Sequence, residues 1–142
     1  MNRSGDSYAV ALLIATLKAN LALTTIVGDK IFWLRAPENT VLPYVVLKCI
    51  EGGDANDSIA GRTYEASWRV YGHTGTIANM IALKDAIYSA LVRVLPIIPT
   101  ALANEVIPLA HLYEVLPVSD SYIVQNNPLY IVGGEYRIKL GL

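Results

Sequence analysis

Two histidines, a single cysteine and scattered carboxylates are the residues of this chain that could carry out catalysis or bind a metal. His73 and His111 lie far apart, and neither belongs to a His-x3-His or Cys-x2-Cys ligand pair. A catalytic histidine needs a partner that orients it, and the sequence contains no Gly-x-Ser-x-Gly turn for a nucleophile. We therefore expect no catalytic residue, no metal site and no cofactor. An enzyme that acts through His73 or His111 is the weakest alternative.

The remaining reactive or glycine-rich segments favour structural roles. Cys49 lies inside the apolar run Tyr44–Ile50, which favours a small buried side chain over a reactive thiol. The segment Gly72–Gly75 lacks the lysine of a phosphate-binding loop and the spacing of a dinucleotide fingerprint. No nucleotide site is therefore expected.

The charge balance excludes some partners and favours others. The net charge is −1, from 11 basic and 12 acidic residues without a long run of either sign, so specific binding to DNA phosphates is not expected. No apolar run reaches the roughly 18 residues that span a bilayer, so no membrane partner is expected. Charged residues make up only 16% of the chain, against about 25% in typical domains. So few charges leave apolar surface uncovered, which predicts association with other protein chains.

Two segments alternate apolar and charged residues as half-buried strands do. In Arg62–Tyr71, Tyr64 and Trp68 share one face, which favours core packing over a base-stacking platform. The second alternation lies in the closing run Leu129–Leu142. The charged residues of both segments form either a solvated sheet face or a subunit interface, and the sequence favours neither. These residues are Glu65, Arg69, Glu135, Arg137 and Lys139.

These strands must be positioned by the elements around them. The helical spacing of apolar residues predicts a helix from Tyr8 to Asn20, capped by Asp6 or Ser7, and a long amphipathic helix from a Thr74 or Thr76 cap to Leu95. Strands are predicted at Lys30–Trp33, Tyr44–Ile50, Leu109–Pro117 and Ser121–Gln125, with a bulge or bend at Gly133-Gly134. The segment Gly52–Gly61 is predicted to be a mobile loop, and Ile97–Pro108 a connection that docks on a neighbouring subunit. The order predicts a single α+β domain over residues 1–142. In it, a mainly antiparallel β-sheet carries the N-terminal helix and the long helix on one face.

Several short motifs occur in an order that resembles the tail-completion, or tail-terminator, family of long-tailed bacteriophages. Val-Gly-Asp precedes a short Ile-Phe strand at Val27–Phe32, and Leu-Pro-Tyr-Val opens a strand at Leu42–Val45. Tyr71-Gly72 then leads into the helix that contains Ala78–Ile87, and Tyr136-Arg137 lies in the closing strand. The connection between Pro96 and Pro108 is longer than the family pattern. Otherwise the resemblance covers nearly the whole chain.

The resemblance implies a structural protein of the virion, located where head and tail meet and assembled in the host cytoplasm. It implies a homo-oligomeric ring, expected to be a hexamer, that stops growth of the tail tube and binds the tail-tube protein and the head connector. DNA would pass through the ring without specific binding. Asp54 and Asp57, in the predicted loop, are candidates to face the lumen or the partner ring. The alternative is a small α+β oligomeric binding module outside any virus.

Overall fold

The computed structural model describes residues 4–57, 61–92, 96–103, 107–108 and 113–141. For residues 54–57, 61–62 and 107–108 only the backbone is described. Along the chain the elements are α1 (Gly5–Lys18), α2 (Leu21–Val27), β1 (Ile31–Trp33), β2 (Tyr44–Asp57), β3 (Gly61–Thr74), α3 (Ile77–Leu91), a 3-10 turn (Thr100–Leu102), β4 (Ile107–Pro108), β5 (Tyr113–Val124) and β6 (Asn127–Gly141).

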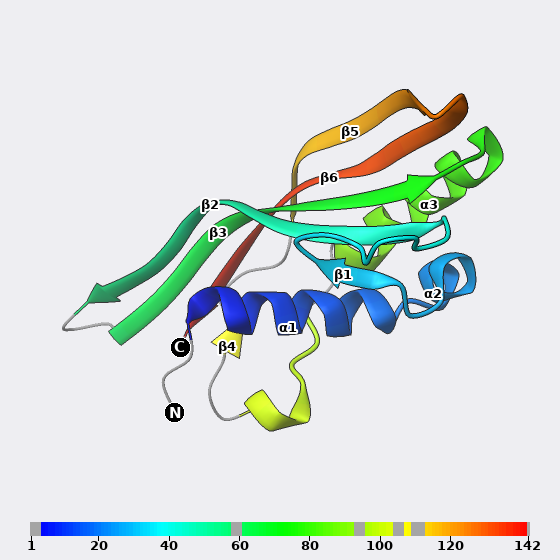
Figure 1. Ribbon diagram of the computed structural model, residues 1–142. Helices are drawn as coiled ribbons and strands as arrows, with labels where there is room; N and C mark the ends of the chain where they lie inside the picture. Colours follow the sequence, from blue (N-terminus) through cyan, green and yellow to red (C-terminus); the bar gives the residue numbers. More distant parts are fainter. Residues whose placement is uncertain (1–3, 58–60, 93–95, 104–106, 109–112, 142) are drawn as a thin grey trace.

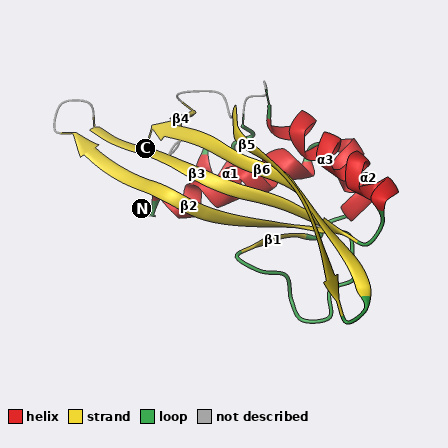
Figure 2. Cartoon of the chain, turned by 90° about the horizontal axis from the view of Figure 1, so that it is seen from above, coloured by secondary structure: helices red, strands yellow, loops and turns green. Residues whose placement is uncertain are grey.

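Within the described residues the strands form one six-stranded sheet in the order β1-β2-β3-β6-β4, and β5 also pairs with β6. β1 runs parallel to β2, and every other pair is antiparallel. In Figure 1 α1 and α2 lie below the sheet and α3 passes behind β3, and Figure 2 shows the three helices on one side of the strands. The predicted fold class is therefore confirmed: a mainly antiparallel α+β sheet carries helices on one face.

The helix-covered face contains the core. Along β3, Tyr64, Ala66, Trp68 and Val70 are fully buried beneath the helices, as the alternation predicted. Gly72 continues this row, and a Cβ built there would lie 2.5 Å from a methyl carbon of Leu83 in α3. The missing side chain at Gly72 thus allows α3 to pack directly on β3.

The N-terminal helix begins earlier than predicted. Ser4, and not Asp6 or Ser7, is the N-cap of α1, and its hydroxyl accepts a hydrogen bond from the Ser7 amide at 3.3 Å. Asn20 caps a second helix, since its Oδ1 accepts a hydrogen bond from the Leu23 amide at 3.0 Å. In the described part of the chain no single helix is long and apolar enough to span a membrane; α1 and α2 pass that test only as a pair, bent by 91°.

The prediction of a mobile loop over Gly52–Gly61 is wrong. β2 and β3 continue pairing to Asp57 and Gly61, so the two strands form a long arm that projects beyond α1 in Figure 1. The pairing shifts by one residue between Cys49 and Glu51, a β-bulge. Gly52 has φ +101, and a Cβ there would collide with the backbone of Glu65. Glycine is therefore required by the bulge, and its presence was misread as a loop signal.

The C-terminal half also differs from the prediction. β5 is one continuous strand over Tyr113–Val124, where two pieces were expected, and residues 109–112 lie outside the described part. The register shift lies in β5, between Glu114 and Leu116, and β6 pairs with β3 without a shift through Gly133-Gly134. A Cβ at Gly133 would collide with the carbonyl oxygen of Val70. The two glycines thus permit close contact between strands and do not form a bulge themselves.

The segment after α3 packs on the body of its own chain. α3 begins after the Thr76 cap, as predicted, but ends at Leu91, and residues 93–95 lie outside the described part. The amide of Ile97 donates a hydrogen bond to Thr16 of α1 at 2.8 Å, and Leu102 is buried in the core. The described part of the connection is therefore held by α1, and its docking on a neighbouring subunit stays a prediction.

Candidate functional site

The face of the sheet opposite the helices carries most of the charged residues singled out in the sequence. Register places Arg69 opposite Glu135, Ser67 opposite Arg137, and Glu65 opposite Lys139 across β3 and β6. We call the outward-facing residues Glu51, Glu65, Arg69, Glu135 and Arg137 the charged strip. The structure therefore brings four of the seven predicted site residues together and adds Glu51, which the sequence reading missed because it treated that end of β2 as a loop.

Arg137 is the centre of the charged strip. Its Nε lies 3.2 Å from a carboxylate oxygen of Glu65, and its Nη1 donates a hydrogen bond to the Ser67 hydroxyl at 2.9 Å. The same Nη1 lies 3.7 Å from a carboxylate oxygen of Glu51. One guanidinium thus bridges β2, β3 and β6. Both glutamates are exposed to solvent, so these ion pairs fix local geometry more than they add stability.

Arg69 makes the second cluster on the strip. Its Nη2 lies 3.7 Å from a carboxylate oxygen of Glu135, and its guanidinium carbon lies 5.0 Å from the centre of the Tyr71 ring. That distance is within the range of a cation–π contact. The Nε of Arg69 is buried without a hydrogen-bond partner among the described atoms. The strip as a whole is an array of opposite charges paired within the chain.

The other three predicted site residues take no part in these ion pairs among the described side chains. Asp54 pairs with Tyr64 and Asp57 with Gly61 in the β2–β3 arm, and their side chains lie outside the described part. Lys139 is exposed and stands opposite Glu65 in the register. The arm therefore separates the two aspartates from the centre of the charged strip.

An aromatic cluster occupies the same sheet face beside the strip. The rings of Tyr44 and His73 stack with centroids 4.9 Å apart, and Phe32 meets Tyr44 edge-on at 6.3 Å. Burial lowers the pKa of His73, an effect that the backbone of Tyr71 partly offsets. A stacked neutral imidazole without an acidic partner among these contacts fits packing better than proton transfer.

Other reactive groups are tied into the core. Trp68 Nε1 donates a hydrogen bond to the Tyr64 hydroxyl at 2.9 Å, and that hydroxyl donates to a carboxylate oxygen of Asp6 at 2.6 Å. Burial, and then the bond to Asp6, raise the pKa of Tyr64 well above its usual value. Cys49 is half-buried beside this hydroxyl, and burial raises its thiol pKa. His111 lies outside the described residues, and within them no three His, Cys, Asp or Glu side chains form a group that could hold a metal.

Apolar side chains are exposed along both edges of the sheet. β5 is exposed over most of its length, and Ile123 near its end is 80% exposed. No strand pairs with the outer edge of β5 in the described residues. The large apolar residues exposed on β5 are Tyr113, Val115, Leu116, Tyr122, Ile123 and Val124. The sequence reading missed this surface because it placed a break within the strand.

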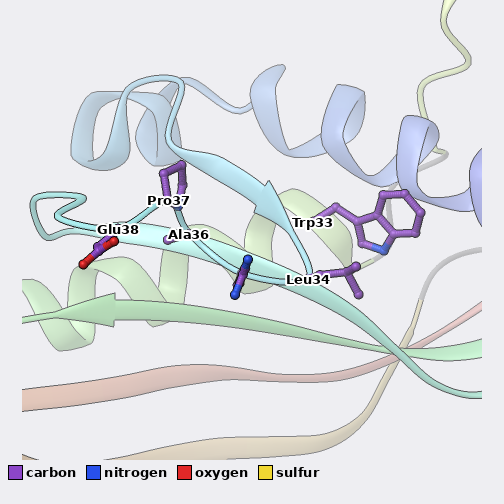
Figure 3. Close-up of a pocket in the computed structure, with 6 residues that line it drawn as sticks. Trp33, Leu34, Ala36, Pro37 and Glu38 are labelled. Carbon is purple, nitrogen blue, oxygen red and sulfur yellow. The ribbon is translucent and has the colours of Figure 1, made fainter.

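The opposite edge contains an open hollow of about 620 Å³ beside β1. It is lined by residues 33–38, and Figure 3 shows Trp33 and Leu34 on one side and Pro37 and Glu38 on the other. Trp33 and Leu34 are both exposed, at 45% and 57%. We call this feature the β1 hollow. Its walls are mainly apolar and come from one loop, so it suits a protein side chain better than a reaction.

Comparison with known proteins gives two findings. The family model described as "Tail completion protein gp17" matches residues 11–107. A chain in the structure titled "Virion of native gene transfer agent (GTA) particle" superposes with a TM-score of 0.61 at 18% sequence identity, covering 94% of this chain and 97% of that chain. At that identity the likeness concerns the fold. No protein with a curated description gives a significant match.

Proposed function

Because the chain belongs to the tail completion protein family, and is thus a structural protein of the bacteriophage virion tail, we propose that it forms a ring at the head-proximal end of the tail. The ring, expected to be a hexamer, ends growth of the tail tube and joins the tail to the head connector. Its partners are copies of itself, the tail-tube protein and the connector. The viral family removes the basis for the alternative of a non-viral binding module.

The observation that carries this proposal is the pair of exposed apolar edges. β5 and β1 lie at opposite edges of the sheet, and each presents large apolar side chains to solvent. A closed ring needs two different surfaces on each subunit, one for each neighbour. A monomer that leaves both edges open would expose strand backbone and apolar area that promote uncontrolled association.

The charged strip supports a second part of the proposal. Its two arginines are already engaged by Glu51, Glu65 and Glu135, which leaves the exposed Lys48 and Lys139 as the lysines of this face of the described sheet. A lumen through which DNA moves must not hold the backbone tightly, because each phosphate contact adds affinity. We propose that the strip, with Lys139 beside it, faces either the lumen or the next ring in the tail. Asp54 and Asp57 reach the same partners at the end of the β2–β3 arm.

The proposal is tested by removing the protein from an assembling phage. Without it, we expect tail tubes of uneven and excessive length and heads that lack tails, measured by electron microscopy of the lysate. Restoring the chain in trans should restore both uniform length and joining. Tails of normal length that are joined to heads in its absence would overturn the proposed function.

A further inference from the structure

We propose that the end of the β5–β6 hairpin of one copy inserts into the β1 hollow of the next copy. This inference rests on the proposed ring and names the contact that would build it. The hairpin tip is defined here as residues 122–127. The occupant of the hollow is a second copy of this chain, held head to tail.

The tip has the shape and composition of an inserting element. β5 and β6 are joined by the two-residue turn Gln125-Asn126, in which both residues have positive φ, so the hairpin ends sharply. The three residues before the turn are Tyr122, Ile123 and Val124, and all three are exposed. Water-exposed β-branched and aromatic side chains at the end of a narrow hairpin gain by burial in an apolar recess.

The β1 hollow has the matching features. Trp33, Leu34, Ala36 and Pro37 supply an apolar wall in a space of about 620 Å³, large enough for several side chains. The hollow lies beside β1 and the tip ends β5, at opposite edges of the same sheet (Figures 1 and 3). Two different edges that fit each other give a heterologous contact, the type that closes into rings when repeated.

Charge complementarity favours a second copy over an unrelated partner. Asp120, two residues before the tip, is the charged residue of β5 nearest to it. Arg35 and Glu38, both exposed, lie in the wall of the hollow. A pair between Arg35 of one copy and Asp120 of the next would favour the head-to-tail contact, because two tips would bring their Asp120 carboxylates together.

Cysteine cross-linking in assembled particles tests the contact. Virions are prepared with the double variant Ala36→Cys, Ile123→Cys and with each single variant, and are oxidised mildly. We expect a ladder of covalent multiples of the 15.4 kDa chain in the double variant. The single variants and the wild type, whose native Cys49 is half-buried, should stay monomeric on a denaturing gel.

The outcomes separate this inference from the proposed function. Monomers only, in particles whose neck still shows a ring, would mean that the ring is joined elsewhere and the inference is wrong. Absence of any ring would overturn the proposed function and this contact together.

A charge exchange decides the matter if the cysteine variants fail to assemble. Arg35→Asp and Asp120→Arg alone should each lower the yield of infectious particles about tenfold, the effect of about 1.4 kcal/mol on a binding equilibrium. The double exchange should restore the yield. Single variants that assemble normally, or a double variant no better than the singles, would overturn the contact.

Discussion

The Tyr64 hydroxyl joins the first helix to the central strand, because it donates to Asp6 of α1 and accepts from Trp68 of β3. We predict that Tyr64→Phe lowers the free energy of unfolding by about 1–3 kcal/mol, since the variant leaves the buried indole N–H unpaired. Urea denaturation at neutral pH measures the effect. Tyr113→Phe, at an exposed position of β5, should change stability little. Equal losses in the two variants would contradict the role of this hydroxyl.

The same residue predicts a dependence on alkaline pH. Burial raises the pKa of Tyr64 above its ordinary value of about 10, so the folded protein keeps its proton while the unfolded chain loses it. Stability should therefore be fully present below pH 10 and fall as pH rises beyond it. Tyr64→Phe should make this fall shallower, as measured by unfolding at stepped pH. An unchanged slope would count against the buried hydroxyl. The remaining slope should come from Tyr136 and Cys49, whose pKa values burial raises, and from Tyr122, whose pKa the hydrogen bond to Asp120 raises.

His73 predicts the opposite dependence on the acid side. Burial lowers its pKa, so the unfolded chain binds a proton more readily than the folded protein. Stability should be present above the ordinary histidine pKa of about 6.5 and decline as pH falls below it. His73→Phe should keep the stack on Tyr44 and remove that decline below about pH 6.5. His111→Gln is the matched control. If His111→Gln removes the decline and His73→Phe does not, His73 is not its cause.

At the scale of elements, the contact between α3 and β3 depends on a missing side chain. A Cβ at Gly72 would lie 2.5 Å from Leu83, whereas one at Gly53 meets nothing within 4 Å. We predict that Gly72→Ala destabilises the fold by about 1–3 kcal/mol through overpacking, and that Gly53→Ala has little effect. Thermal unfolding compares the two. Leu83→Ala should lose less in the Gly72→Ala background than in the wild type, and strictly additive losses would rule out the proposed collision.

The elements that the sequence predicted correctly are those whose pattern reflects burial. β3 and α3 were predicted because each element buries one face, which places apolar residues at every second position of the strand and at helical spacing in the helix. The Gly52–Gly61 segment was wrongly predicted to be a loop because glycine and other turn-forming residues occur both at β-bulges and in loops. Only the pairing of this segment with β3 distinguishes the two. β5 was misread for a related reason: a strand exposed on both faces has no alternation to detect.

The candidate site was predicted in part for similar reasons. Strand register brings Glu65, Arg69, Glu135 and Arg137 together, and alternation alone could place them on one face. Ile77, Ile81 and Tyr88 are apolar residues of the predicted amphipathic helix, and all three are exposed in the structure. Helical spacing shows that residues share a face, but it does not say whether a sheet or another subunit covers them. The β1 hollow depends on loop shape, which no spacing pattern encodes.

At the scale of the whole molecule, the low charge of the chain corresponds to apolar surface at both sheet edges and on α3. This distribution fits a subunit whose stability and solubility are completed by neighbours. The two edges also differ in role from the charged strip, because the arginines of the strip already form ion pairs within the chain. We therefore propose that the edges of the sheet mediate assembly and that its charged face contacts the lumen or the next ring.

The most direct test is an electron cryomicroscopy reconstruction of the neck of a phage that carries this protein, with each copy of the chain located. The account predicts a closed ring of identical subunits between the tail tube and the head connector, with the β5 edge of each copy against the β1 edge of the next. Single copies, or copies distributed along the tail away from the head, would contradict it.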